Sequence, residues 1–192
     1  VVFKMKSIKI QINKLGAIRD SEIELYPLVV LSGESGLGKS YLAFLIHYIY
    51  KLILERRISG FFVDEKWKYD KFTAEQRKTG TLVVKTIELQ HWINNDAKDY
   101  LRNIIGNTNL EIDINIIFPF DKDEYEFIYK TELFELPEKK EETFLYFELN
   151  DLGFRIPESA KNLGTQPWSS LLSVLLKELF FGSTSLEQTF MM

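Results

Sequence analysis

The first pattern along the chain is an alternation of apolar and polar residues. Within residues 6–13, isoleucines alternate with polar residues from Ile8 to Ile12. A period of two is typical of a strand that buries one face. Residues 17–25 alternate in the same way, and residues 14–16, Lys-Leu-Gly, form a turn signal between the two runs. The pattern predicts two short strands joined as an antiparallel hairpin.

A different pattern comes after the hairpin. Residues 27–32 are mostly apolar and β-branched, which predicts a buried strand. Residues 39–57 then show a helical period and are apolar on nearly every side. We expect this helix to be covered on more than one side, with a stripe formed by Leu42, Leu45, Ile46, Ile49, Ile53 and Leu54.

The middle of the chain is less regular. Residues 58–80 are mixed, and we interpret them as a surface segment leading into a charged stretch, residues 66–78. Residues 81–106 show a diluted helical period, and Gly106-Asn107 is a typical helix end. We expect His91 and Trp92 on this helix to pack rather than to bind a ligand. We interpret His47 on the preceding helix as a packed core or rim histidine.

The pattern returns to alternation in the second half of the chain. Residues 110–118, 125–130 and 143–149 predict two or three antiparallel strands joined by acidic connections. Residues 151–167 contain Gly153, Pro157, Gly164 and Pro167 and are interpreted as a loop. Residues 168–181 predict a strong helix ended by Gly182, with a core face of Leu171, Leu172, Leu175, Leu176 and Leu179.

Composition limits the class of protein. The chain has 192 residues, of which 45% are hydrophobic, so it can bury a sizeable core. Its net charge of −4 argues against a protein that coats nucleic acid, although a local basic patch is compatible with it. Cysteine is absent, which excludes disulfides and cysteine-based sites and favours a cytoplasmic location. The apolar runs are too short to predict a membrane span.

The most informative motif lies between the predicted strand 27–32 and the helix after it. Eight residues read G-x-x-x-x-G-K-S, the phosphate-binding pattern called Walker A: Gly33, Glu34, Ser35, Gly36, Leu37, Gly38, Lys39 and Ser40. The glycines allow several backbone N–H groups to point at one anion, and the helix N-terminus adds its dipole. Lys39 would reach the β- and γ-phosphates, and the Ser40 hydroxyl would bind Mg²⁺. The motif predicts a site for a nucleoside triphosphate with Mg²⁺ and leaves the base open.

A family resemblance covers about the first quarter of the chain. The run from Ile8 to Ile18, the strand end Ile23-Glu24-Leu25 and the segment Leu31–Ser40 resemble the N-terminus of RecF/SMC-like ABC-type ATPases. They are similar in particular to the bacterial stand-alone AAA family ATPases and the OLD nucleases. Those proteins open with x-I-x-N-F-G-x-I and E-I-x-L strands before L-x-V-L-x-G-x-N-G-S-G-K-S. Here Leu15 stands where an aromatic is usual and Ser35 where an asparagine is usual.

The resemblance implies a fold and a division of the chain. It implies an α/β P-loop NTPase fold: an ABC-ATPase-like lobe, an antiparallel hairpin before the Walker A strand, and a mixed α+β insertion. Residues 1–57 would form the nucleotide-binding core and residues 58–109 a mostly helical insertion. Residues 110–192 would supply the antiparallel strands and C-terminal helix of the same domain.

The resemblance also implies a mode of action. Relatives bind ATP in one subunit and complete the site with a second, so ATP drives homodimerisation and hydrolysis reverses it. DNA or a nuclease partner, and a role in DNA repair or phage defence, would be expected. We find no signature loop, switch histidine or convincing Walker B strand. We therefore expect the N-terminal part of a longer ATPase, which binds ATP weakly and hydrolyses it poorly; a naturally short, binding-only protein is the alternative.

Other readings of single residues remain open. Asp64 and Glu65 come after an apolar run as Walker B acids do, and they would serve as metal or base residues in a self-contained, kinase-like phosphotransferase. Glu148 also comes after an apolar run, although a plain sheet strand is the simpler account. Gln166 is a candidate γ-phosphate sensor by position only. A third reading is a scaffold that uses nucleotide for stability alone.

Overall fold

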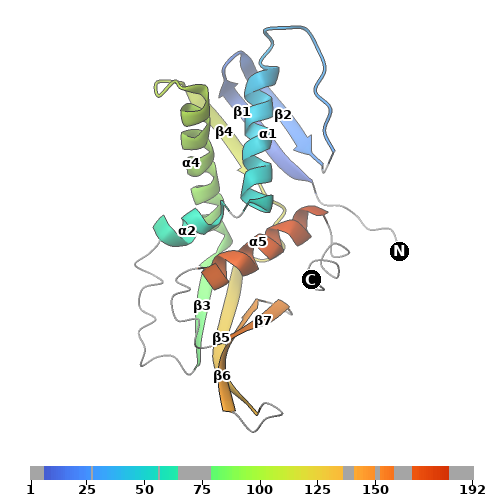
Figure 1. The fold of residues 1–192 in the computed structure, drawn as a ribbon. Helices are drawn as coiled ribbons and strands as arrows, with labels where there is room; N and C mark the ends of the chain where they lie inside the picture. The colour runs from blue at the N-terminus through green and yellow to red at the C-terminus, as the bar shows by residue number, and fades with distance from the viewer. Residues whose placement is uncertain are drawn as a thin grey trace, which may run out of the picture.

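The computed structural model describes residues 7–26, 28–55, 57–64, 79–135, 141–149, 152–157 and 166–181. Within these ranges the chain forms a mixed α/β structure with a three-stranded and a four-stranded antiparallel sheet (Figure 1). The buried apolar residues of both sheets and of the helices belong to one core cluster.

The three-stranded sheet has the order β2-β1-β4. Its strands are β1 (Ile8–Leu15), β2 (Ile18–Leu25) and β4 (Ile112–Ile117). Ile10 lies opposite Ile23 on one side and opposite Ile116 on the other. The inner face carries Ile8, Ile10, Ile12, Ile112, Ile114 and Ile116, all buried. Burying an isoleucine contributes about 1.5–3 kcal/mol, so the alternation that predicted the hairpin also holds it to the core. The hairpin prediction is confirmed.

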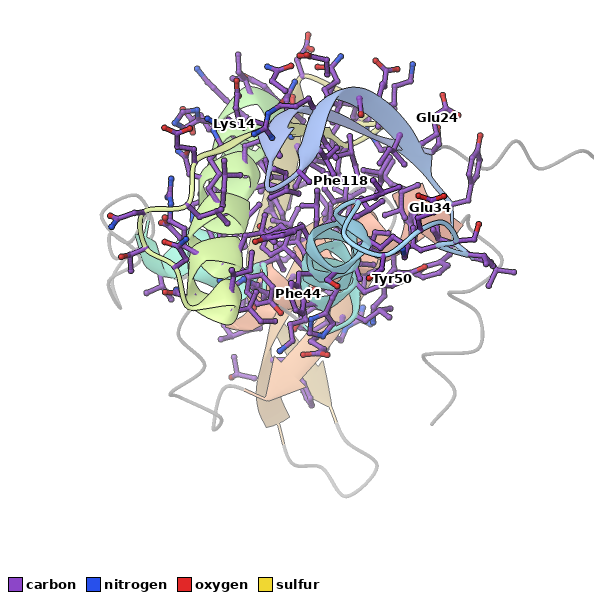
Figure 2. All side chains as sticks on the ribbon, turned by 90° about the horizontal axis from the view of Figure 1, so that it is seen from above. Lys14, Glu24, Glu34, Phe44, Tyr50 and Phe118 are labelled. Carbon is purple, nitrogen blue, oxygen red and sulfur yellow. The ribbon has the colours of Figure 1, made fainter. Side chains whose placement is uncertain are left out.

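Two long helices cover this sheet. Helix α1 (Lys39–Leu54) and helix α4 (Thr86–Ile105) lie side by side over the hairpin and β4 (Figure 1). Seen from above, Phe118 lies between the hairpin and α1, while Phe44 and Tyr50 lie on the other side of α1 (Figure 2). Both helices were predicted. α1 is covered on more than one side, as expected, because it packs on both α4 and α5.

The four-stranded sheet has the order β3-β5-β6-β7. It consists of β3 (Thr79–Lys85), β5 (Glu124–Glu135), β6 (Glu141–Leu149) and β7 (Leu152–Pro157). Helix α5 (Gln166–Phe181) crosses this sheet, and the short helix α2 (Ser59–Asp64) packs beside α5 (Figure 1). The predicted core face of α5 is confirmed, since Leu171, Leu172, Leu175, Leu176 and Leu179 are all buried.

The strand predicted at residues 27–32 is not formed over its described part, Leu28 to Ser32. Leu28 to Ser32 have no regular secondary structure, and the side chains of Leu28 and Val30 are 83% and 82% exposed. A strand exists only where another strand supplies hydrogen-bond partners, and none of the described strands pairs with this segment. Apolar composition was therefore a misleading signal here.

Three smaller predictions are also corrected. Residues 81–85, predicted as the start of a helix, complete strand β3, and the helix begins at Thr86. Residues 152–157, predicted as loop, form edge strand β7. Phe61 and Phe62 were assigned to a surface segment but are buried in α2. The ring of Phe61 meets that of Trp92 edge to face, with 5.9 Å between the ring centroids.

The outer edge of β4 is closed by side chains of α4. The amide of Asn94 accepts a hydrogen bond from Ile116 N (2.7 Å) and donates one to Ile116 O (3.3 Å). Gln90 accepts a hydrogen bond from Phe118 N (3.0 Å) and also donates to Ile116 O. These side-chain amides take the place of a neighbouring strand, so the edge does not present unpaired backbone groups.

Several predictions concern residues outside the described ranges. They include Glu65, the charged stretch 66–78, Gly164, the stop signal Gly182 and residues 136–140 of the acid-rich stretch 132–142, which the sequence predicts as a solvated loop. Residues 132–135 and 141–142 of that stretch belong to strands β5 and β6, so the loop prediction is wrong at both of its ends.

Candidate phosphate-binding loop

The Walker A loop has the backbone that its glycines predict. Gly33, Gly36 and Gly38 all have positive φ values, of 133°, 85° and 92°. Side-chain-bearing residues rarely adopt these conformations, so glycine is required at each position. Residues 33–37 are exposed, whereas Gly38 is buried where the loop enters α1.

The loop ends in the N-terminus of α1. The first helix-type hydrogen bond is donated by Leu42 N to Gly38 O, at 3.1 Å. In an α-helix the N–H groups before this bond have no partner within the helix. The amides of Lys39, Ser40 and Tyr41 are thus directed out of the helix end, where the helix dipole also favours an anion.

Lys39 lies back across the loop. Its ammonium donates a hydrogen bond to the carbonyl oxygen of Gly33 at 2.7 Å and another to that of Glu34. Among the residues that the structure describes, no acid forms an ion pair with Lys39. The positive charge is held at the mouth of the loop by two neutral carbonyls, and a phosphate would be a stronger acceptor than either.

The donor set of the loop fits a phosphate group. It combines an ammonium, the outward amides of the helix end and glycines with open space around them, since a Cβ on Gly33 or Gly36 would meet nothing within 4 Å. Ser40 is exposed in the first turn of α1 and would hold Mg²⁺ beside the phosphates. No group of three acidic, histidine or cysteine residues that could hold a metal occurs in the described ranges. A metal here would therefore rely on Ser40, phosphate oxygens and water.

The two candidate Walker B segments do not form Walker B strands. Phe61 to Asp64 lie in helix α2, which comes after α1 and so lies near its C-terminal end. That end is about 24 Å from Lys39, the length of sixteen helical residues. Glu148 lies in β6, an antiparallel strand paired with β5 and β7, as the simpler account predicted.

Gln166 and the two histidines take no part in the loop. Gln166 is the first residue of α5, and that helix reaches α1 through Phe180, whose ring centroid is 6.1 Å from that of Tyr50. His47 and His91 are both exposed, which corrects the expectation of packing for His91. A ring nitrogen of His47 lies 2.8 Å from the Tyr100 hydroxyl, and one of His91 lies 2.9 Å from Asn95 Nδ2.

A polar cluster between α1 and α4 was not predicted from the sequence. Arg57 forms a two-pronged ion pair with Asp96, with N–O distances of 2.7 and 2.9 Å, and its guanidinium lies over the rings of Tyr48 and Tyr100. Burial alone would lower the pKa of Arg57, but the Asp96 hydrogen bond and charge raise it overall. Burial, aided by the Asp96 charge, raises the pKa of Tyr48, whose hydroxyl donates to Ile93 O at 3.0 Å. The cluster fixes α1, which carries the loop.

No family model, no curated protein and no solved structure matches the chain. Among the described helices, none has the length and apolar character needed to cross a membrane. Any function assigned to the chain therefore depends on the loop itself.

Proposed function

We propose that the chain binds ATP with Mg²⁺ through residues 33–40. The observation that carries the proposal is the position of Lys39 at the start of α1, above a loop whose three glycines have positive φ. An ammonium group, a helix N-terminus with unbonded amides and glycines with open space around them are the features of a site that binds phosphate. In this proposal the Lys39 ammonium exchanges its two carbonyl partners for the β- and γ-phosphates, and Ser40 holds the metal.

Within this proposal the chain is the ATP-binding N-terminal portion of an ABC/SMC/RecF-like ATPase. The β1–β2 hairpin, which lies directly before the loop segment, supports this reading. Binding of ATP would then join two copies through their nucleotide sites, and DNA or a nuclease would be the further partner. Hydrolysis needs a residue that orients water, and we expect this chain alone to hydrolyse ATP poorly.

The kinase-like alternative has less support. It requires Asp64 or Glu65 beside the phosphates, but Asp64 belongs to the helix near the far end of α1. The scaffold alternative shares the ATP-binding step but has no hydrolysis or phosphoryl transfer after it. Turnover with a phosphate acceptor separates the kinase-like alternative from the main proposal, and ATP-dependent dimerisation separates the scaffold alternative from it.

The test is a calorimetric titration of the chain with ATP and Mg²⁺. We expect Lys39→Ala to abolish measurable binding, because an ammonium that contacts two phosphates is lost. Lys51→Ala is the matched control: Lys51 lies at the other end of α1, where it pairs with Glu55 at 3.2 Å. Retained binding in Lys39→Ala, or equal loss in both variants, would contradict the proposal. Turnover with a phosphate acceptor by the monomeric chain would favour the kinase-like alternative.

A further inference from the structure

The turn between β1 and β2 is held in a defined shape. Gly16 has a φ of 60° at the first central position of a two-residue turn, where hairpins favour glycine. The guanidinium of Arg19 donates from Nη1 to the carbonyl oxygens of Gly16 and Ile18, at 2.6 and 2.7 Å. The hydrogen bonds of Arg19 therefore stabilise the turn without help from any other element.

The residue after this turn lies against the end of the phosphate loop. A Cβ placed on Gly38 would be 2.6 Å from Cγ1 of Ile18 and 3.1 Å from its Cδ1. No real Cβ approaches that closely, so the Ile18 side chain occupies the space that any other residue at position 38 would need. Ile18 is half-buried and packs on the core through the same side chain.

A second contact lies one helical turn further along. A Cβ on Gly16 would be 2.7 Å from both Cδ2 and Cε2 of Tyr41. The ring of Tyr41 thus rests directly on the backbone of the turn. Gly38 directly precedes α1 and Tyr41 lies in its first turn, so the hairpin turn touches the helix start at two points.

The other side of the loop has less support, where Val29 is half-buried against the core. Leu28 and Val30 are more than four-fifths exposed, and none of the described strands pairs with their segment. The position of Lys39 relative to the core is therefore set mainly by α1 and by the residues that contact the first turn of this helix.

We propose that the β1–β2 turn is the positioning element of the phosphate site, with Ile18 and Tyr41 as its positioning residues. This inference rests on the proposed function. Ile18 limits where Gly38 lies, and Gly38 directly precedes the amide and side chain of Lys39. Binding sites lose affinity when donors shift by about 0.5 Å or more, so a loosened contact at Gly38 weakens phosphate binding.

The experiment compares three isoleucine variants of the full chain by ATP–Mg²⁺ titration and thermal unfolding. Ile18→Ala removes the contact with Gly38, and we expect about tenfold weaker binding. Ile18→Val keeps Cγ1, the atom nearest to Gly38, and should bind within about twofold of the wild type. Ile23→Ala is the matched control: it removes the same atoms from a half-buried isoleucine of the same strand, away from the turn.

A second pair of variants covers the case in which Ile18→Ala does not fold. Tyr41→Ala removes the ring from the turn, and Tyr50→Ala removes another half-buried tyrosine of α1 far from the loop. We expect Tyr41→Ala to weaken ATP binding about fivefold and Tyr50→Ala to leave it unchanged.

Two outcomes overturn the inference in different ways. If the wild type binds ATP and the turn variants bind as tightly as their controls, the turn does not position the site. If the wild type binds no ATP, the proposed function fails and the inference fails with it.

A separate readout without ATP is hydrogen exchange of the Leu42 amide, which bonds to Gly38 O. Exchange should be faster in Ile18→Ala than in Ile23→Ala; equal rates would contradict a role of Ile18 in holding Gly38.

Discussion

The two sides of the phosphate loop are held very differently. On the C-terminal side, α1 buries Leu45, Ile49 and Leu52 completely and packs on α4 and α5. On the N-terminal side, Leu28 and Val30 are exposed in a segment that none of the described strands pairs with. A helix satisfies its own backbone groups, whereas a strand depends on a neighbour. The loop therefore takes its position mainly from α1 and from the hairpin turn, and the preceding segment contributes the half-buried Val29.

The largest effect should come from the core face of α1. Leu45→Ala removes a fully buried side chain, and we expect a loss of about 2–5 kcal/mol in the free energy of unfolding. Urea unfolding followed by circular dichroism measures it. A loss under about 1 kcal/mol would mean that α1 does not hold the loop as described.

A smaller loss should result from breaking the ion pair between Arg57, which follows the end of α1, and Asp96 of α4. Asp96→Ala leaves the half-buried guanidinium of Arg57 without its carboxylate, and we expect a loss of about 1–3 kcal/mol. Asp99→Ala is the control, because Asp99 pairs with Arg102 on the exposed side of the same helix. Equal losses in the two variants would show that the Arg57 cluster is no stronger than a surface ion pair.

A similar loss should result from opening the edge of β4. Asn94→Ala removes the acceptor for Ile116 N and a donor for Ile116 O, and we expect a loss of about 1–2 kcal/mol. Asn95→Ala, on the exposed side of α4, should change the free energy of unfolding by less than about 0.5 kcal/mol. The same urea unfolding curves decide between them.

The raised pKa of Tyr48, which is buried in α1, predicts that the free energy of unfolding depends on pH. Its pKa is raised in the folded chain, so it stabilises the fold fully below the unfolded value of about 10, and this contribution is lost as pH rises above that value. Above about pH 10 the loss approaches roughly 1.4 kcal/mol per pH unit. Tyr48→Phe should lose stability less steeply than the wild type over this range. If the two proteins lose stability equally steeply above about pH 10, the raised pKa of Tyr48 is contradicted.

The smallest effect should come from the N-terminal side of the loop. Leu28→Ala removes as many atoms as Leu45→Ala but from an 83% exposed side chain, and we expect a change within about 0.5 kcal/mol. A loss as large as that of Leu45→Ala would mean that Leu28 packs in solution, and the contrast between the two sides would not hold.

The contrast also shows what the sequence could predict. Strands β1 and β2 and helix α5 were predicted because each buries one face against neighbours, and burial on one face leaves a period in the sequence. Helix α1 is covered on more than one side, but its apolar residues still recur with a helical period. The eight loop residues were found because phosphate binding needs glycine, lysine and serine at set positions. Their role in binding remains a prediction.

The remaining features depend on contacts that no local pattern records. Residues 28–32 resemble a strand in composition but have no partner among the described strands. Strand β7 was missed because Gly153 and Pro157 suggest a loop. In the structure a Cβ on Gly153 would overlap the Tyr146 hydroxyl, and Pro157 ends an edge strand, where proline is tolerated. The contacts of Ile18 with Gly38 and of Arg57 with Asp96 join residues far apart in the sequence, so periodicity could not reveal them.

The most direct test of phosphate binding by the loop is to map ATP–Mg²⁺ onto the chain by amide NMR. We predict that the largest shifts fall on the loop amides from Gly33 to Ser40, that smaller shifts reach Gly16 and Ile18 in the hairpin turn, and that Lys39→Ala removes both sets. Shifts that fall elsewhere on the chain, or no shifts at saturating ATP, would contradict the claim that this loop binds phosphate.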